Sequence, residues 1–408
     1  MNTRRTTIWL LGIGLAASWQ VPAAHAQIIA PREAAQIEFG SLSIYPSVRL
    51  IDVGIDENVY NDAVDAKEDF TFTVASKALA VLRLGLNELM FSSGSDYIWF
   101  REQASERATN AAHAVRFNLS ASRFKPFIGA ERIRTRTRPS VEIDARAQRL
   151  DHMVLAGTNI TLTERTAISA TAKYTDSRFD QGEQFRGVPL ADQLNGRSQM
   201  YSAGVRYAVT PLTTLVVTGN YEDEKFRKSP LRNSKSYSVT PAVEFAPEAA
   251  IRGSFSAGYQ LFAPENPELA DHWGLIMEGV LNWSIMGRTT FDLGVRRNVN
   301  YSYQDTEPMY LQTGARFVMT QRLFGPIGIQ GSAERQHLSY RWRHGVSPTP
   351  GAEHREDTFD VYGGGVLVDL GRGFTVLVGA EQARRHSPVD PRQNFNRTRL
   401  VGNITIGQ

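Results

Sequence analysis

The chain lacks cysteine, has few lysines and contains no long apolar run beyond its first 26 residues. Without cysteine it can form no disulfide and carry no lipid-modified cysteine anchor. The basic residues are 38 arginines and only seven lysines. The net charge of +3 includes Arg4 and Arg5, so the rest of the chain is nearly neutral and its composition indicates neither a broadly basic surface nor a nucleic-acid partner. No later segment reaches the ~20 apolar residues of a membrane helix. A membrane-spanning chain of this kind would have to be a closed β-barrel.

The N-terminus has the features of a secretory signal peptide. Arg4 and Arg5 precede an apolar stretch at 8–17, and Ala24-His25-Ala26 forms an A-x-A cleavage site. We expect residues 1–26 to be removed, residues 27–42 to form a short periplasmic segment, and residues 43–408 to form one domain.

The stretch 201–221 indicates how that domain is built. On both sides of the turn at Thr210-Pro211, odd positions are mostly apolar or aromatic and even positions are mostly polar or small. This alternation predicts a β-hairpin with one apolar and one polar face. In a soluble sandwich the apolar face would point inward, whereas in an outer-membrane barrel it would face lipid.

Loop lengths favour the barrel. Strand-like segments are separated alternately by short turns and long polar connections, and a sandwich gives no reason for such regularity. The short turns fall near 85–87, 122–125, 163–165, 210–212, 246–249, 284–287, 321–325 and 370–373. The long connections fall around 55–68, 101–109, 138–147, 177–197, 223–234, 262–271, 302–308, 343–356 and 384–396. The sequence therefore predicts an all-β, up-and-down antiparallel barrel of about 18 strands, with 16 as the alternative, placing short turns in the periplasm and long loops outside.

Strand parity separates the expected lipid face from the expected lumen face. In 273–283 the odd positions are apolar or glycine and carry a Trp at each end, as in the aromatic girdles of membrane barrels. Arg297 shares its parity with Phe291 and Leu293, which requires a bulge or another register. The expected interface aromatics are Tyr201, Tyr207, Tyr221, Trp273, Trp283, Tyr340 and Trp342.

Arginines at every second position carry the functional hypothesis. Charge is costly on a lipid face, so these side chains must enter the lumen or lie above the membrane. A neutral salt-bridge network and an electropositive track for an anionic solute are both open. The expected pore-lining set is Arg132, Arg134, Arg136, Arg138, Arg206, Arg252, Arg335, Arg341, Arg343, Glu222, Glu244, Glu278 and Asp292.

Other chemistry has little support. The acidic loop around 56–69 lacks EF-hand spacing, and the histidines show no HExxH or other metal pattern. Asp271-His272 has no marked nucleophile beside it. We therefore expect no catalytic residues, no metal site and no cofactor.

Ser43 to Leu50 and Val53 to Val59, together with the Thr-Pro-Leu-Thr turn at 210–213, resemble the opening strand and turns of the putative beta-barrel porin 2 family. The resemblance implies an outer-membrane barrel, in several cases encoded beside polysaccharide machinery and working with a periplasmic export protein. One departure is the C-terminus, where Ile404-Thr405-Ile406-Gly407-Gln408 lacks the usual terminal aromatic.

These features give three functional hypotheses. The leading one is passage of a secreted, anionic polysaccharide through the Gram-negative outer membrane, with 177–197 and 343–356 as candidate constrictions. The alternative is a general or anion-preferring diffusion porin, and the third is a non-transporting adhesin or structural barrel. Expected partners are outer-membrane lipid and lipopolysaccharide, the barrel-assembly machinery and a periplasmic polysaccharide-export protein.

Overall fold

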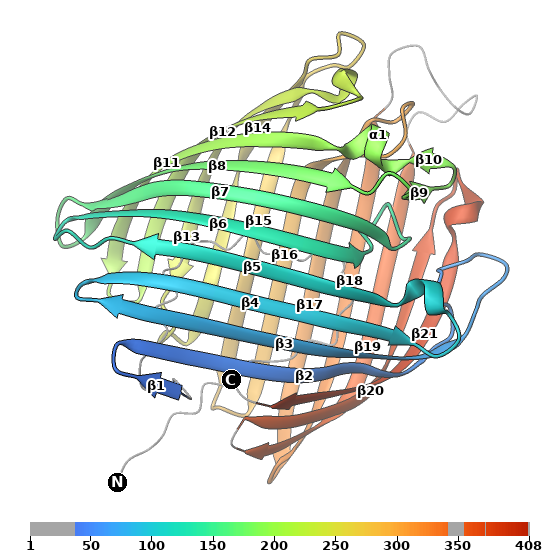
Figure 1. The fold of residues 1–408 in the computed structure, drawn as a ribbon, viewed down its shortest axis with the longest axis horizontal. Helices are drawn as coiled ribbons and strands as arrows, with labels where there is room; N and C mark the ends of the chain where they lie inside the picture. Colours follow the sequence, from blue (N-terminus) through green and yellow to red (C-terminus); the bar gives the residue numbers. More distant parts are fainter. Residues whose placement is uncertain (1–36, 342–354, 372, 407–408) are drawn as a thin grey trace.

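The computed structural model describes residues 37–341, 355–371 and 373–406, in which eighteen antiparallel strands form one closed sheet (Figure 1). Each strand pairs with its neighbours in the chain, which confirms the predicted up-and-down barrel and its eighteen strands. The wall strands are β2 (Leu42–Asp56), β3 (Asp69–Leu84), β4 (Asn87–Phe100), β5 (Ala108–Asn118), β6 (Phe124–Thr137), β7 (Ala147–Thr161), β8 (Thr166–Phe179), β11 (Gly196–Thr210), β12 (Thr213–Phe226), β13 (Ser234–Phe245), β14 (Ile251–Pro264), β15 (His272–Ile285), β16 (Thr289–Tyr301), β17 (Met309–Phe324), β18 (Ile327–Arg341), β19 (Glu356–Gly371), β20 (Phe374–His386) and β21 (Phe395–Ile406).

The barrel closes between its first and last long strands. β2 pairs with β3 on one side and with β21 on the other, and Ile404 and Ile406 lie opposite Leu50 and Val48. A bulge interrupts this seam near Asp52, whose backbone N–H donates to Asn403 Oδ1 at 2.8 Å. Closure leaves no sheet edge exposed, as a spanning sheet requires.

Short turns and long loops gather at opposite ends of the barrel, as their alternation predicted. The tight turn after β3 places Gly85 at φ +65°, which glycine adopts without strain. The long-loop end carries the hairpin β9 (Gln184–Phe185) and β10 (Val188–Pro189), the helix α1 (Leu190–Leu194) and short 3₁₀ turns. The short strand β1 (Ile37–Phe39), which pairs with β2, lies at the other end (Figure 1). Among the described residues, no helix is both long and apolar enough to cross a membrane.

The two faces of the wall differ in the way the hairpin at 201–221 predicted. Val205 and Leu215 are about half exposed on the outer face, and Trp273 is 70% exposed there. The next residue on each strand, Arg206 after Val205 and Val216 after Leu215, turns inward. A continuous apolar exterior with charged groups on the opposite face is the pattern of a barrel surrounded by lipid.

This face assignment predicts unequal losses of stability for two nearby substitutions on β11. Val205→Arg places a charge on the lipid face near the middle of β11, and we expect it to lower the free energy of unfolding by about 2–4 kcal/mol. Ser202→Arg places the same charge on the lumen face of that strand and should cost much less. Denaturant unfolding in lipid vesicles measures both, and equal losses would contradict the assignment.

Candidate functional site

The outer mouth of the barrel, at the long-loop end, is where distant parts of the chain converge. The loop at 138–147 leaves β6 and returns to β7, but its Val141 is buried against the inner face of β17–β21. Those strands lie between five and nine places from β6 around the ring. The apolar contacts come from Tyr310, Leu338, Tyr340, Phe359, Val361, Ala383 and Phe395. The loop therefore reaches across the lumen.

Arg385 of β20 tethers that loop. Its guanidinium is almost fully buried and donates from Nη1 to the backbone oxygens of Val141 and Glu142, both at 2.9 Å. Nη2 donates to Asp357 Oδ2 at 2.9 Å, and Asp144 Oδ2 lies 3.5 Å from Nη1. A buried guanidinium is strongly disfavoured without such partners, so the docked loop and the buried charge stabilise each other.

A second buried arginine, Arg355, extends the network to the loop at 302–308. Arg355 forms ion pairs with Asp357 at 2.6 Å and with Glu307 at 3.0 Å, and all three side chains are almost inaccessible to solvent. Its guanidinium carbon lies 4.2 Å from the centre of the Tyr340 ring. Arg355 thus connects the start of β19 to the loop at 302–308.

Glu142 joins the loop at 138–147 directly to the loop at 302–308. Its carboxylate accepts from Ser302 Oγ at 2.6 Å and from the Tyr303 backbone N–H at 3.2 Å. Burial raises the pKa of Glu142 from 4.5 to about 7, although these hydrogen bonds and the nearby Arg355 and Arg385 oppose the shift. Burial likewise raises the pKa of Asp144.

The segment between β8 and β11 covers another part of the mouth. Phe185 and Leu190 pack with Ile143 of the loop at 138–147 and with Tyr303, whose ring centre is 4.8 Å from that of Phe185. On its other side, Arg186 donates to the backbone oxygen of Arg392 at 2.6 Å. This segment includes most of the predicted constriction at 177–197, and it does lie at the mouth. The other predicted constriction, 343–356, falls almost wholly outside the described residues.

Along the wall, several predicted pore residues face the lumen in pairs of opposite charge or polarity. Arg206 makes a two-pronged ion pair with Glu244, and Glu278 lies 3.6 Å from Arg296. Arg252 donates to Asn282, whose amide donates to Asp292 at 2.5 Å. Glu222 accepts from Ser198. The inner wall thus carries both hydrogen-bond donors and hydrogen-bond acceptors.

Two groups of predicted pore arginines do not face the lumen, and their assignment is corrected. Arg132 and Arg134 share a face of β6 with Ile128, which is 57% exposed on the outside. Arg335 and Arg341 share the outer face of β18 with Ile329, and Arg335 forms a two-pronged ion pair with Asp360 of β19. Arg132, Arg134 and Arg335 lie in the half of their strands nearer the long loops, and Arg341 ends β18, so all four are displaced from the strand middle toward the headgroup level, where charge costs less.

The remaining members of the arginine set have different positions. Arg136 continues the outer-face parity of β6 beside Gln148, so its lumen assignment is also corrected. Arg138 lies beyond the strand end and turns to the mouth, where Nη2 donates to Val59 O at 2.8 Å and Nε donates to Asp144 O at 2.5 Å. Arg343 lies outside the described residues. Arg297 needs no bulge, because it lies on the outer face opposite Met277 and Thr313 and donates to Leu275 O and Thr313 Oγ1.

The aromatic predictions divide in the same way. Tyr201 and Tyr221 lie side by side on the outer face with ring centres 6.3 Å apart, and Tyr207, Trp273 and Trp283 are on that face too. Tyr340 is the exception: it is fully buried on the inner face beneath Val141, so its interface assignment is corrected. Trp342 lies outside the described residues.

The sequence reasoning missed the loop at 138–147 as the segment that crosses the mouth. The available signal was Val141 and Ile143, two apolar residues within an otherwise polar connection. The partners of Val141 lie more than 150 residues away and those of Ile143 include Phe179, Phe185 and Tyr303, so local pattern did not identify them.

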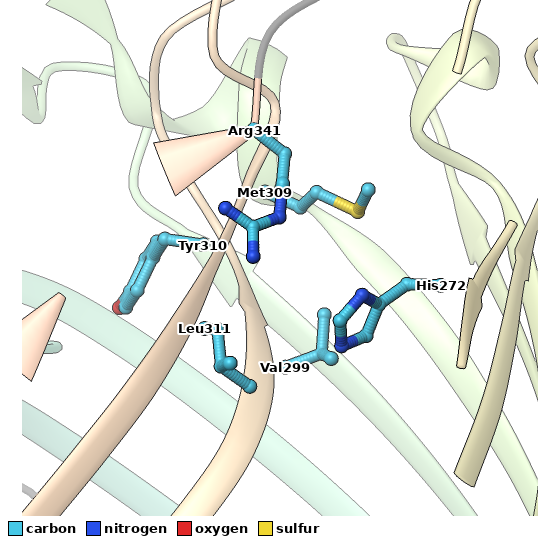
Figure 2. A pocket seen from close by; sticks show the side chains of 6 residues that line it. All are labelled: His272, Val299, Met309, Tyr310, Leu311 and Arg341. Atoms are coloured by element: carbon cyan, nitrogen blue, oxygen red, sulfur yellow. The ribbon is translucent and has the colours of Figure 1, made fainter. Parts of the chain in front are cut away.

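A small cavity lies where β15 and β16 separate near the outer end. Their pairing stops at Met277 and Arg297, and beyond it the cavity is lined by His272, Val299, Met309, Tyr310, Leu311 and Arg341 (Figure 2). Its volume of about 10 Å³ suits one water molecule and excludes a larger ligand. Among the described residues, no group of three His, Cys, Asp or Glu side chains is placed to hold a metal ion.

A closed barrel with an apolar exterior, a charged inner wall and loops folded over its outer mouth defines a porin-like protein of the outer membrane. The sequence matches the family described as putative beta-barrel porin 2 over residues 30–406, so the chain belongs to that family. No functionally curated protein matches the sequence.

One solved porin shares the fold at low identity, and two further structures align less well. A BenF-like porin from Pseudomonas fluorescens Pf-5 aligns with a TM-score of 0.52 and 10% identity over 91% of this chain and 100% of the porin. OccK3 (OpdO) from Pseudomonas aeruginosa gives 0.49 and 11% over 89% and 96% of the two chains. The FrpB iron transporter from Neisseria meningitidis gives 0.43 and 10% over 84% of this chain, which spans 62% of the transporter's length.

Loss of the Arg385 tether should loosen the mouth. In Arg385→Gln, the ion pairs to the loop and to Asp357 are lost, so we expect faster protease cleavage within 138–147 and a higher single-channel conductance. The matched control is Arg206→Gln, which removes a lumen arginine that touches no mouth loop. Unchanged cleavage and conductance in Arg385→Gln would show that the tether does not hold the loop.

The pKa of Glu142 predicts a pH dependence of the mouth. In the docked loop the Glu142 carboxyl has a pKa of about 7, whereas in a released loop its pKa would return to 4.5. Because the docked state binds this proton more tightly, docking is strongest at low pH and weakens as the pH rises toward 7. We therefore expect lower conductance at pH 5.5 than at pH 8. Glu142→Gln should flatten this dependence, and an undiminished pH response in that variant would assign it to another group.

Proposed function

We propose that this protein is an outer-membrane channel that is closed at rest and opens to pass a secreted polysaccharide delivered by a periplasmic export partner. The observation that carries the proposal is the position of the loop at 138–147. Arg385 holds this loop across the lumen, and its Val141 packs against apolar side chains of the opposite inner wall. These buried contacts hold the loop across the passage and narrow it. A channel for a long polymer benefits from closure between transport events.

The inner wall supports transit with weak contacts. Its arginines are paired with carboxylates or amides, as in Arg206–Glu244 and Arg252–Asn282, so the surface offers both donors and acceptors. Sugar hydroxyl groups can use both kinds of partner, and many weak contacts allow movement where one tight site would stall it. Because Arg132, Arg134, Arg335 and Arg341 lie on the outer face, most of the support for an electropositive lumenal track that selects anionic solutes is lost. The proposal is therefore not limited to anionic polymers.

The second candidate is a diffusion porin for small solutes. It is favoured by the fold shared with the BenF-like porin and by the charged lumen. This alternative predicts stable open-channel currents from the purified protein alone. A structural or adhesive barrel predicts no current even when the mouth is loosened by Arg385→Gln.

Deletion of the gene separates these functions. The export proposal predicts that secreted and surface polysaccharide fall strongly in the deletion strain and return with the wild-type gene. The same strain complemented with a variant whose loop is locked in the docked position should stay deficient, although the barrel is present at normal abundance in the outer membrane. Unchanged polysaccharide in the deletion strain would overturn the export proposal.

Conductance of the purified protein provides the complementary measurement. The export proposal predicts few openings from the wild type without a partner and frequent openings from Arg385→Gln. Continuous large openings of the wild type would instead support the diffusion porin.

A further inference from the structure

The outer face of β5–β7 carries a group of basic side chains that pore function does not use. We define the outer basic patch as His113, Arg132, Arg134, His152 and Arg178. His113, Arg132 and His152 lie in direct cross-strand register, and Arg178 extends the patch onto β8. Arg132, Arg134 and Arg178 are exposed.

The patch lies above an apolar surface on the same strands. Val115, Ile128 and Val154 are 43%, 57% and 49% exposed on the outer face, on the short-turn side of the patch. Arg132 is five residues from the outer end of β6, roughly 12 Å along the membrane normal for a tilted strand. The patch therefore lies where the hydrocarbon of the outer leaflet gives way to its headgroups.

Among the described residues, no carboxylate lies in cross-strand register with Arg132 or Arg134, and Asp176 is the carboxylate beside His152 and Arg178. The outer-face neighbours of Arg132 and Arg134 are two histidines, Ala111 and Leu150, while Glu131 and Asp151 point to the lumen side. Gln148 accepts from Arg134 at 2.5 Å once its amide oxygen is turned toward the guanidinium, but it brings no charge. Asp176, opposite His152, is already shared by Arg178 and Arg227, both at 2.6 Å.

Some other basic residues of the outer face do have a carboxylate partner. Arg335 lies on the outer face of β18 and makes two hydrogen bonds to Asp360, at 2.6 and 3.0 Å. Lys225 is likewise paired with Glu265 and Asp223. Within the part of the chain that the structure describes, Arg132 and Arg134 have no carboxylate in cross-strand register, which leaves them available to an anion of the surrounding membrane.

We propose that Arg132 and Arg134, with His113 and His152 beside them, bind a phosphate group of the phosphorylated glycolipid in the outer leaflet. Two arginines on one strand can each make paired hydrogen bonds to phosphate oxygens, and their alkyl stems lie along the apolar wall. The lipid acyl chains then cover Val115, Ile128 and Val154 directly below. Basic clusters at the headgroup level are the general means by which membrane proteins hold anionic lipids.

The test compares lipid binding of the full-length barrel with two matched variants. Wild type and Arg132→Gln/Arg134→Gln are purified in detergent and titrated with lipid A carrying its phosphates and with dephosphorylated lipid A. We expect wild type to bind the phosphorylated form about tenfold or more tightly than the dephosphorylated form, because two charge-assisted contacts are involved, and the double variant to lose this preference. Arg335→Gln, which removes an outer-face arginine already paired with Asp360, should retain it.

Each other outcome overturns the proposal. If wild type binds both lipids equally, or the double variant discriminates as well as wild type does, the patch is not a phosphate site. If phosphatidylglycerol binds as tightly as phosphorylated lipid A, the patch attracts any anionic lipid and the assignment to the glycolipid fails. Heat-modifiable migration on electrophoresis verifies that each variant is a folded barrel, so loss of binding is not loss of structure.

Discussion

Closure of the sheet between β2 and β21 is the constraint on which the other features depend. In lipid each backbone N–H and C=O needs a partner within the protein, and only a sheet without edges provides this for strands. Closure divides every strand into an outer and an inner face. The outer face presents apolar side chains such as Val205 to lipid, whereas the inner face carries ion pairs such as Arg206–Glu244. An enclosed lumen also leaves room for loops to fold inward.

At the outer mouth, buried charge holds one such loop in place. Arg385 is inaccessible and is bonded to two backbone oxygens of the loop at 138–147, and Asp357 links it to Arg355 and hence to Glu307. Removing any member would leave a charge uncompensated in a buried site, which makes the docked arrangement cooperative. Glu142 adds a proton-sensitive contact to the same structure. Under the proposed function, this network is what keeps the channel closed until transport begins.

Local pattern predicted the barrel, because strand alternation and loop lengths repeat along the chain. It predicted the faces of Arg206 and Arg252 on the same basis. It misplaced Arg132 and Arg335 because a charged side chain can face the lumen or lie on the outer face toward the headgroups, and parity alone does not distinguish the two. Both residues lie on the outer face, in the half of the strand nearer the long loops. Tyr340 was misplaced because the inner face is apolar where Val141 docks on it. Such contacts between residues far apart in the chain leave no periodic signal, so the mouth had to be seen in the structure.

The most direct test locks the loop at 138–147 to the wall. Because the natural chain has no cysteine, Val141→Cys with Ala383→Cys introduces a single possible disulfide within one buried cluster. Single-channel recording of the cross-linked and the reduced protein measures its effect. The account predicts that the cross-linked barrel shows no large openings and that reduction restores them. Equal openings in both states, with the cross-link verified on the same sample, would contradict the claim that this loop closes the channel.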